Sequence, residues 1–235
     1  MRARARGVLV ACAAVAAVWL SGCVTTTRMN PAFPARRAAI KRVAVVPPDV
    51  TIVRLTFKGD NALARDEVDR AAARLPGLIA AELRGHGFEV KEAGLDERRF
   101  AGEPDLRFRT TQVQRAFLRA QMDLYETEVI ETSKANRTEQ TLGPLVNRLA
   151  DHAAVDGLVV STMVGLRKSW GEFVKDVFVA WGGAMKKGAI LRVGLVDGDT
   201  GDILWANSVV TQDEDFQGEG LDKMVKSAFR QFPKR

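Results

Sequence analysis

The sequence predicts an α/β fold, because short β-branched runs alternate with longer segments of helical periodicity. Residues 42–47, RVAVVP, form an apolar run closed by proline, which is typical of a buried strand. Residues 62–85 place apolar side chains every three or four positions, which indicates a helix. Residues 189–210 contain two alternating runs around the polar sequence DGDTGD, and this pattern predicts a β-hairpin.

The N-terminus has the parts of a bacterial export signal. Residues 1–7 carry Arg2, Arg4 and Arg6 and no acid, and residues 8–20 are apolar throughout. This run is shorter than the roughly 20 residues that a membrane-spanning helix needs. An ordinary secretory signal followed by a chance cysteine is the alternative interpretation.

The sequence LSGC at 20–23 resembles the lipobox of bacterial lipoproteins. The resemblance implies cleavage before Cys23 and acyl chains such as palmitate on the Cys23 thiol and on the new amino terminus. It also implies an outer-membrane anchor facing the periplasm, because Val24 stands where an aspartate would favour the inner membrane. The expected organisation is a signal peptide at 1–22, a lipidated tether at 23–40 and a periplasmic domain at 41–235.

Charge and cysteine content exclude two classes of function. The chain has 35 basic and 29 acidic residues, and three of the basic residues leave with the signal, so the mature surplus is only +3. Such a small surplus does not indicate nucleic-acid binding. Cys12 leaves with the signal and Cys23 is used by lipid, so no thiol or disulfide chemistry is expected.

Patterns along the chain predict the other elements. Residues 24–39 are polar and interrupted by prolines, so no packed element is expected there. Pro76 predicts a kink or a break in the 62–85 helix near Leu75. Residues 93–107 are expected to be irregular, and 126–140 to be a solvated helix or loop. Further strands are expected at 50–57, 88–91 and 158–163, and further helices at 109–124, 142–153 and 217–232.

Residues 165–188 form an amphipathic segment, in which basic residues flank six large apolar side chains at helical spacing: Trp170, Phe173, Val174, Val177, Phe178 and Trp181. Tryptophan favours boundaries where an apolar ring meets water, and flanking cations suit anionic head groups or an acidic partner. We expect a membrane or partner contact through Trp170, Phe173, Val177, Phe178 and Trp181. The alternatives are ordinary core packing on the sheet, or a β-hairpin within an oligomeric barrel.

The sequence lacks the common short motifs of catalytic and metal sites, so it does not indicate an enzyme. The sequence has no G-x-S-x-G, no P-loop and no complete G-x-G-x-x-G. His86 and His152 are the only histidines and stand in no metal-ligand spacing, and a helix-terminating turn explains His86. Asp197 and Asp199 suggest calcium, but turn chemistry accounts for both. No cofactor or metal is therefore expected, although a Ser-His-Asp triad stays open.

The order of elements resembles a group of envelope proteins that includes the curli secretion-channel lipoprotein (CsgG), a lipoprotein activator of a peptidoglycan synthase (LpoB) and the N-terminal domain of TolB. RVAVVP, the strand after AVDG at 154–157 and the hairpin sequence VDGDTGDILW carry the resemblance, which spans 42–232. It implies a mixed sheet of about five strands flanked by helices, with a C-terminal hairpin and an amphipathic insert.

For function, the resemblance implies a non-enzymatic lipoprotein in envelope assembly, export or surface organisation. Such a protein works through self-association or through contacts with envelope partners. A regulator of a cell-wall synthase is the alternative, and an envelope hydrolase is a third.

Overall fold

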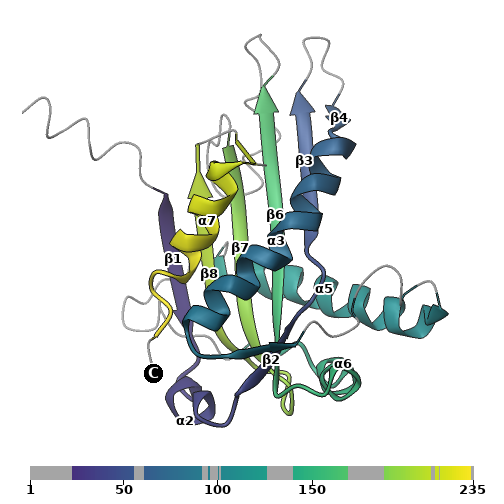
Figure 1. Cartoon of the computed structure of the whole chain (residues 1–235), viewed down its shortest axis with the longest axis vertical. Helices are drawn as coiled ribbons and strands as arrows, with labels where there is room; N and C mark the ends of the chain where they lie inside the picture. Colours follow the sequence, from purple (N-terminus) through teal and green to yellow (C-terminus); the bar gives the residue numbers. More distant parts are fainter. Residues whose placement is uncertain are drawn as a thin grey trace, which may run out of the picture.

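The computed structural model describes residues 23–55, 61–91, 102–125, 140–168, 188–212 and 218–233, and the positions 95, 100, 215 and 216. Within them, a mixed sheet of eight strands carries helices on both faces (Figure 1). The predicted α/β class is therefore confirmed. The sheet has more strands than the five expected, because residues assigned to the tether and to the start of the first long helix also form strands.

The strands are β1 (Val24–Met29), β2 (Arg42–Val45), β3 (Asp49–Leu55), β4 (Asn61–Leu63), β5 (Glu89–Lys91), β6 (Gly157–Lys168), β7 (Gly188–Asp197) and β8 (Ile203–Thr211). The helices are α2 (Phe33–Arg37), α3 (Arg65–Gly85), α5 (Pro104–Tyr125), α6 (Leu145–Ala153) and α7 (Glu219–Phe229). The sheet order is β1-β8-β7-β6-β2-β5, and β3 lies beside the second half of β6 with β4 as its partner. Both β2 and β3 run parallel to β6.

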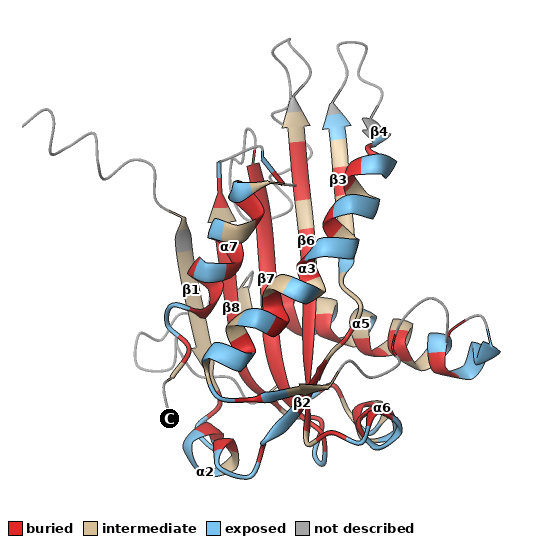
Figure 2. Ribbon diagram, viewed as in Figure 1, coloured by how far each residue is buried: buried red, intermediate tan, exposed pale blue. Residues whose placement is uncertain are grey.

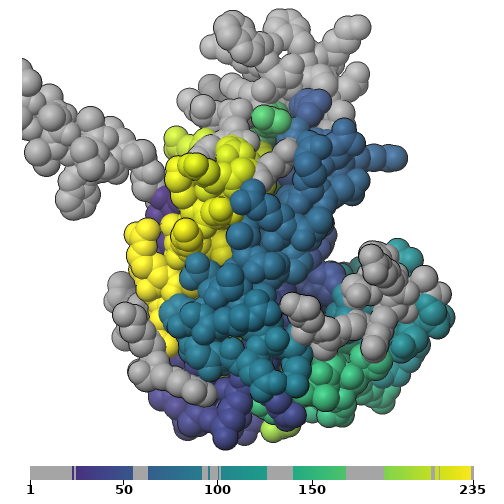
Figure 3. Space-filling view, in the orientation of Figure 1, coloured from purple at the N-terminus to yellow at the C-terminus, as the bar shows by residue number. Residues whose placement is uncertain are grey.

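The predicted hairpin, β7 and β8, lies at the centre of the sheet. Every residue of β7 is buried, because helices cover both faces of the sheet (Figure 2). Alternate β7 residues such as Leu191 and Leu195 belong to the core beneath α3 and α7, whereas Val196 belongs to the core on the other face. Figure 3 shows α3 and α7 side by side over the first face.

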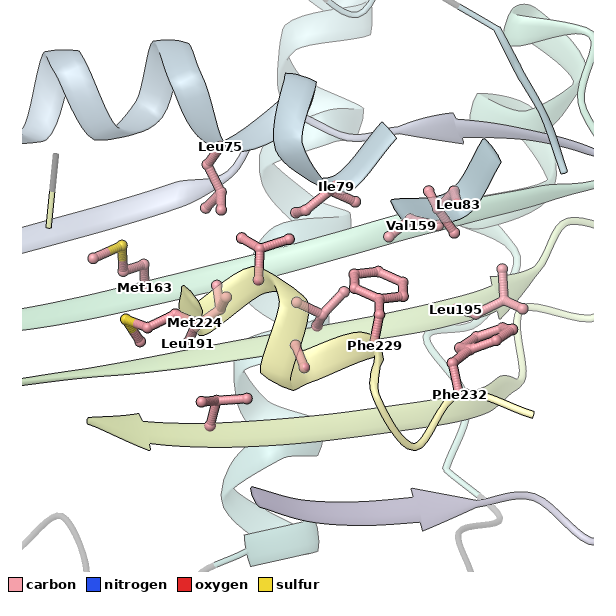
Figure 4. Close-up of a cluster of buried hydrophobic side chains, with 14 of the residues drawn as sticks. Leu75, Ile79, Leu83, Val159, Met163, Leu191, Leu195, Met224, Phe229 and Phe232 are labelled. Carbon is pink, nitrogen blue, oxygen red and sulfur yellow. The ribbon is translucent and has the colours of Figure 1, made fainter. Parts of the chain in front are cut away.

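Side chains from two helices and two central strands meet in the core beneath α3 and α7. Figure 4 shows Leu75 and Ile79 of α3 directed toward the sheet, with Met224 and Phe229 of α7 beside them. Both α3 residues are fully buried, and Phe229 is 1% exposed. The two helices and the central strands therefore pack around one hydrophobic core on this face.

Pro47 and Pro48 separate β2 from β3, and both strands pair with β6. Because proline cannot donate a ladder hydrogen bond, pairing with β6 is interrupted there. Val45 lies opposite Val159, and Asp49 lies opposite Thr162. The stretch that joins β2 to β3 therefore contains one more residue than the matching stretch of β6. One extra residue reverses the alternation of side chains between the two faces.

Helix α3 runs unbroken through Pro76, so of the kink or break predicted near Leu75 the break is wrong. Its buried stripe consists of Ala71, Leu75, Ile79 and Leu83, each 0% exposed. Burial of three large aliphatic side chains, at roughly 1.5–3 kcal/mol each, offsets the cost of about 3 kcal/mol for an internal proline. The helix begins at Arg65 rather than at 62, because Asn61–Leu63 pairs with β3 as β4.

Residues 24–37 form packed elements, so the expectation that no packed element forms there is wrong. β1 pairs with β8 over six residues, and α2 buries Phe33, whose ring meets Phe232 edge-on at 5.9 Å. The prolines do not prevent this packing. Pro34 stands in the first turn of α2, where its missing N–H costs no hydrogen bond.

Candidate functional site

The topology brings separated parts of the chain to one end of the sheet, which is the upper end in Figure 1. Val24 lies opposite Val210 at the end of β8, and Ala189 lies opposite Thr211. Leu166 lies opposite Gly188, and Leu55 lies opposite Lys168. We call this end the upper edge and define it by Cys23, Leu55, Lys168, Gly188 and Thr211.

Cys23 lies directly before β1 at the upper edge. Its side chain is partly buried and packs against the core beneath α3 and α7. Val24 is already paired with β8, so the chain leaves no spacer between the cysteine and the sheet. One residue spans at most about 3.5 Å, and any group attached to Cys23 is therefore held against the domain.

Both ends of the amphipathic segment meet the upper edge. Residues 165–168 belong to β6 and Gly188 belongs to β7, which corrects the expected boundaries of the insert, because pairing of the two strands continues to Leu166 opposite Gly188. The expected contact residues lie outside the described residues, and their function stays a prediction: Trp170, Phe173, Val177, Phe178 and Trp181.

A buried carboxylate joins the elements beneath the upper edge. Glu67 of α3 is 3% exposed, and its Oε1 accepts hydrogen bonds from Arg54 Nη2 at 2.6 Å and Arg167 Nη1 at 2.7 Å. Burial raises the pKa of Glu67, but the hydrogen bonds and charges of the two arginines outweigh it, so the pKa lies below its ordinary value. The cluster ties α3 to β3 and β6.

The sequence predictions do not include this cluster, although the position of Glu67 is a signal for it. Glu67 continues the α3 stripe four residues before Ala71, and a lone acid on an apolar stripe predicts a buried partner. The two arginines could not be assigned to it from the sequence. In the sequence, Arg167 is one of the cations that flank the amphipathic segment.

The opposite, lower end of the sheet carries a second set of ion pairs. Arg36 of α2 donates through Nε and Nη2 to the Asp197 carboxylate at 2.6 and 2.8 Å. The N–H groups of Asp199 and Thr200 donate to the same carboxylate. Burial raises the pKa of Asp197, whose side chain is 1% exposed, but these donors and the Arg36 charge hold it below its ordinary value.

Asp156 forms the other ion pair of the lower end. Arg42 Nη2 donates to its carboxylate at 2.6 Å, and the N–H groups of Lys41 and Arg42 donate as well. The Arg42 hydrogen bond is the largest influence and lowers the pKa of Asp156 to about 2. A cavity of about 350 Å³ lies between these pairs, with the exposed acids Asp151 and Asp199 also in its lining.

The β7–β8 turn is built as a turn and gives no support for calcium. Asp197 is used by Arg36 and by the turn N–H groups. Among the described residues, no group of three or more His, Cys, Asp or Glu side chains is arranged to hold a metal. Gly201 has φ +76°, a conformation that glycine adopts readily in a turn. Gly198, the other glycine of this turn, has no positive φ.

Both histidines belong to helices or their ends, one at the end of α3 and one in α6. His86 is the C-cap of α3, as predicted, and its ring lies 5.0 Å from that of Phe232. His152 lies on the exposed side of α6. Of the helices that the structure describes, none has the length and apolar character to cross a bilayer.

Comparison with known proteins leaves the family open. No family model matches the chain, and no curated protein matches it. The chain is similar to a solved PelC dodecamer from Paraburkholderia phytofirmans, with 12% identity and a TM-score of 0.38 over 91% of this chain and 99% of that chain. A dodecameric leucine-to-methionine variant of PelC matches with the same values and is covered over 100% of its chain. A TM-score at this level assigns no function.

Proposed function

We propose that this chain is a lipoprotein of the outer membrane, anchored through acylated Cys23 and facing the periplasm. Its role is envelope assembly, export or surface organisation through contacts with itself or with envelope partners, and not catalysis. The observation that carries the proposal is the position of Cys23. It adjoins β1 without a spacer, at the edge where both ends of the amphipathic segment meet the sheet.

Because there is no spacer, the anchor would determine which end of the domain faces the membrane. β1 and β7 are separated only by β8, so Cys23 and the start of β7 are two strand spacings apart, about 10 Å. Acyl chains on Cys23 would hold the upper edge against the head groups. Leu63 of β4 is 53% exposed near this edge, opposite Val53 in β3, which adds an apolar side chain on the same side.

A second contact would reinforce the lipid anchor. Trp170 and Trp181 are the boundary residues that we propose for it, and Arg167 and Lys168 lead from β6 into their segment. Acyl chains contribute about 0.8 kcal/mol per buried CH₂, and a basic or aromatic contact adds to that anchoring. The segment therefore acts together with the anchor.

Acylation of the full chain tests the anchor. Cells expressing the chain are labelled with an alkyne analogue of palmitate, and the membranes are fractionated. Cys23→Ser should give an uncut and unlabelled precursor, whereas Cys12→Ser, a control within the signal, should be labelled and processed normally. Normal labelling and membrane retention of the Cys23→Ser chain would overturn the proposal.

The size of the unlipidated mature chain tests the mode of action. A particle much larger than a monomer in size-exclusion chromatography with light scattering supports self-association. A monomer favours the alternative role as a regulator of a cell-wall synthase. Crosslinking in the native envelope would then identify the partner.

A further inference from the structure

Helix α5 has an outer face of mixed apolar and basic character, defined by Phe108, Arg115, Arg119 and Met122. Phe108 is 60% exposed and Met122 is 44% exposed, and both arginines are exposed. At 100° per residue these four positions fall within one narrow stripe of the helix. Large exposed apolar side chains gathered with charges mark contact surfaces more often than bare solvent-facing surface.

The inner face of α5 holds the helix in a fixed position. Val113 and Phe117 are fully buried on the side opposite the outer face. The Phe117 ring lies so close to Gly194 that a Cβ there would stand 2.5 Å from it, and Gln114 Nε2 donates to the Pro47 carbonyl at 2.6 Å. The outer face is therefore presented by a rigid helix.

The position of α5 on the sheet excludes the anchoring membrane as its occupant. Gly194, beneath Phe117, lies five residues along β7 from Ala189, which is opposite Thr211 at the upper edge. Five strand residues span about 17 Å, so head groups at the upper edge do not reach the α5 crossing. A protein surface of opposite charge suits both the apolar and the basic side chains of this face.

The lower end of the same chain offers that charge. Of the cavity acids there, Asp156 and Asp197 are occupied by Arg42 and Arg36. Asp151 is exposed on α6, and the Asp199 side chain is 88% exposed with only a 3.5 Å contact to Arg36. We call these two acids the acidic rim. The negative charges of its exposed carboxylates complement the positive charges of Arg115 and Arg119.

We propose that the outer face of α5 in one copy docks on the acidic rim of a second copy. The inference rests on the proposed self-association and names its two surfaces. Because the surfaces differ, the contact is heterologous, and each copy has one of each to offer. Such an assembly adds copies until it closes into a ring or continues as a filament.

Charge reversal tests the pairing in the mature chain carrying Cys23→Ser, by sedimentation velocity at several concentrations. The rim variant is Asp151→Lys with Asp199→Lys, and the helix variant is Arg115→Glu with Arg119→Glu. Each alone should associate at least tenfold more weakly than the parent. All four side chains are exposed, so unchanged circular dichroism and Tm should show intact folding. A matched control is Lys226→Glu with Arg230→Glu, which should assemble as the parent does.

Mixing the two variants separates this arrangement from others. In the mixture the unchanged α5 face meets the unchanged rim, and the reversed α5 face meets the rim of reversed charge, so both contacts are complementary and assembly should be restored. If the parent assembles and both variants assemble equally well, the two surfaces are wrong and self-association stands. If the variants are monomeric but do not pair on mixing, the heterologous pairing is wrong. A parent that stays monomeric would overturn self-association itself and this inference with it.

Discussion

Arg36 and Asp197 are joined by two hydrogen bonds, 2.6 and 2.8 Å long, across 161 positions of sequence. One residue belongs to the N-terminal arm formed by β1 and α2, and the other ends the central strand β7. The pair therefore fastens the arm to the turn at the end of the sheet opposite Cys23. A pull on the proposed anchor at Cys23 would be borne by the pairing of β1 with β8 and by this ion pair.

Stability should fall in acid because of the two lower ion pairs. The pKa of Asp197 and that of Asp156, about 2, both lie below the ordinary aspartate value of about 3.9. The unfolded chain therefore binds protons first, and the stabilisation present above pH of about 4 is lost as the pH falls toward 2. Urea unfolding between pH 6 and pH 2 measures this loss.

Two variants assign the acid effect. Arg36→Gln and Arg42→Gln remove the cations that lower the two pKa values, so each should flatten the pH dependence and reduce stability at neutral pH. Arg230→Gln removes an exposed cation at the end of α7 and should leave the curve unchanged. Glu67 also has a lowered pKa, so part of the acid slope should remain in the double variant Arg36→Gln with Arg42→Gln. A slope as steep as that of the parent would assign the effect to carboxylates other than Asp156 and Asp197.

The strands and helices that the sequence predicts well are those with strong local patterns. The α3 stripe at Leu75, Ile79 and Leu83 and the alternation around DGDTGD depend on near neighbours, so a single sequence reveals them. The N-terminal arm was missed because its apolar anchors are few. Phe33 becomes core only where Phe232, nearly two hundred residues later, lies beside it.

The candidate site divides in the same way. LSGC, a local pattern, predicts lipid attachment at Cys23, but the position of this residue against the sheet depends on the pairing of β1 with β8. Glu67 and Arg167 meet through tertiary packing alone. The continuity of α3 through Pro76 also comes from packing on the sheet, which outweighs the local preference for a break.

The two glycines of the β7–β8 turn should respond to valine for different reasons. Gly201 has φ +76°, and a Cβ there would lie 2.5 Å from the Gly143 carbonyl oxygen, so Gly201→Val combines strain with a clash. A Cβ at Gly198 would lie 2.7 Å from the Asp156 carbonyl oxygen without a positive φ. We expect losses of roughly 2–4 kcal/mol for each variant in urea unfolding.

Small and polar substitutions separate strain, crowding and metal binding in this turn. Gly201→Asn tolerates a positive φ better than valine and should cost less than Gly201→Val if strain contributes. Asp199→Ala should leave stability nearly unchanged, since the side chain is 88% exposed. A calcium affinity that disappears in Asp199→Ala with no change in stability would show that the turn is a metal site.

The Glu67 cluster should respond non-additively to loss of its arginines. Arg54 and Arg167 share one oxygen of the buried carboxylate, so either can remain when the other is removed. Their side chains are 51% and 40% exposed, and each single alanine variant should cost at most about 1 kcal/mol. The double variant leaves Glu67 buried without its cations and should cost more than the sum, about 2–4 kcal/mol.

A change at Glu67 provides the control for that cycle. In a Glu67→Gln background the two arginine substitutions should become additive within about 0.5 kcal/mol, because the buried charge is gone. Additive losses in the parent chain would mean that the arginines stabilise the strands independently of Glu67.

Trp170 and Trp181 are expected to provide the membrane or partner contact beside the anchor. In the sequence both stand between the end of β6 and the start of β7. The structure places these two strand ends at the same edge as Cys23. The double variant Trp170→Ser with Trp181→Ser, in the mature chain carrying Cys23→Ser, should keep its Tm. Its flotation with vesicles containing anionic lipid, or its self-association, should fall severalfold, because the apolar rings that favour the boundary are lost.

An exposed aromatic residue elsewhere gives the matched control for vesicle binding. Phe108→Ser removes a ring that is 60% exposed on α5, a helix whose Phe117 lies against Gly194, about 17 Å along β7 from the upper edge, so flotation should be unchanged. The opposite pattern, a large drop in Tm with unaltered flotation and association, would place the two tryptophans in the core. The upper edge would then keep only Cys23 as its contact with the membrane, and flotation of the unlipidated chain should be negligible.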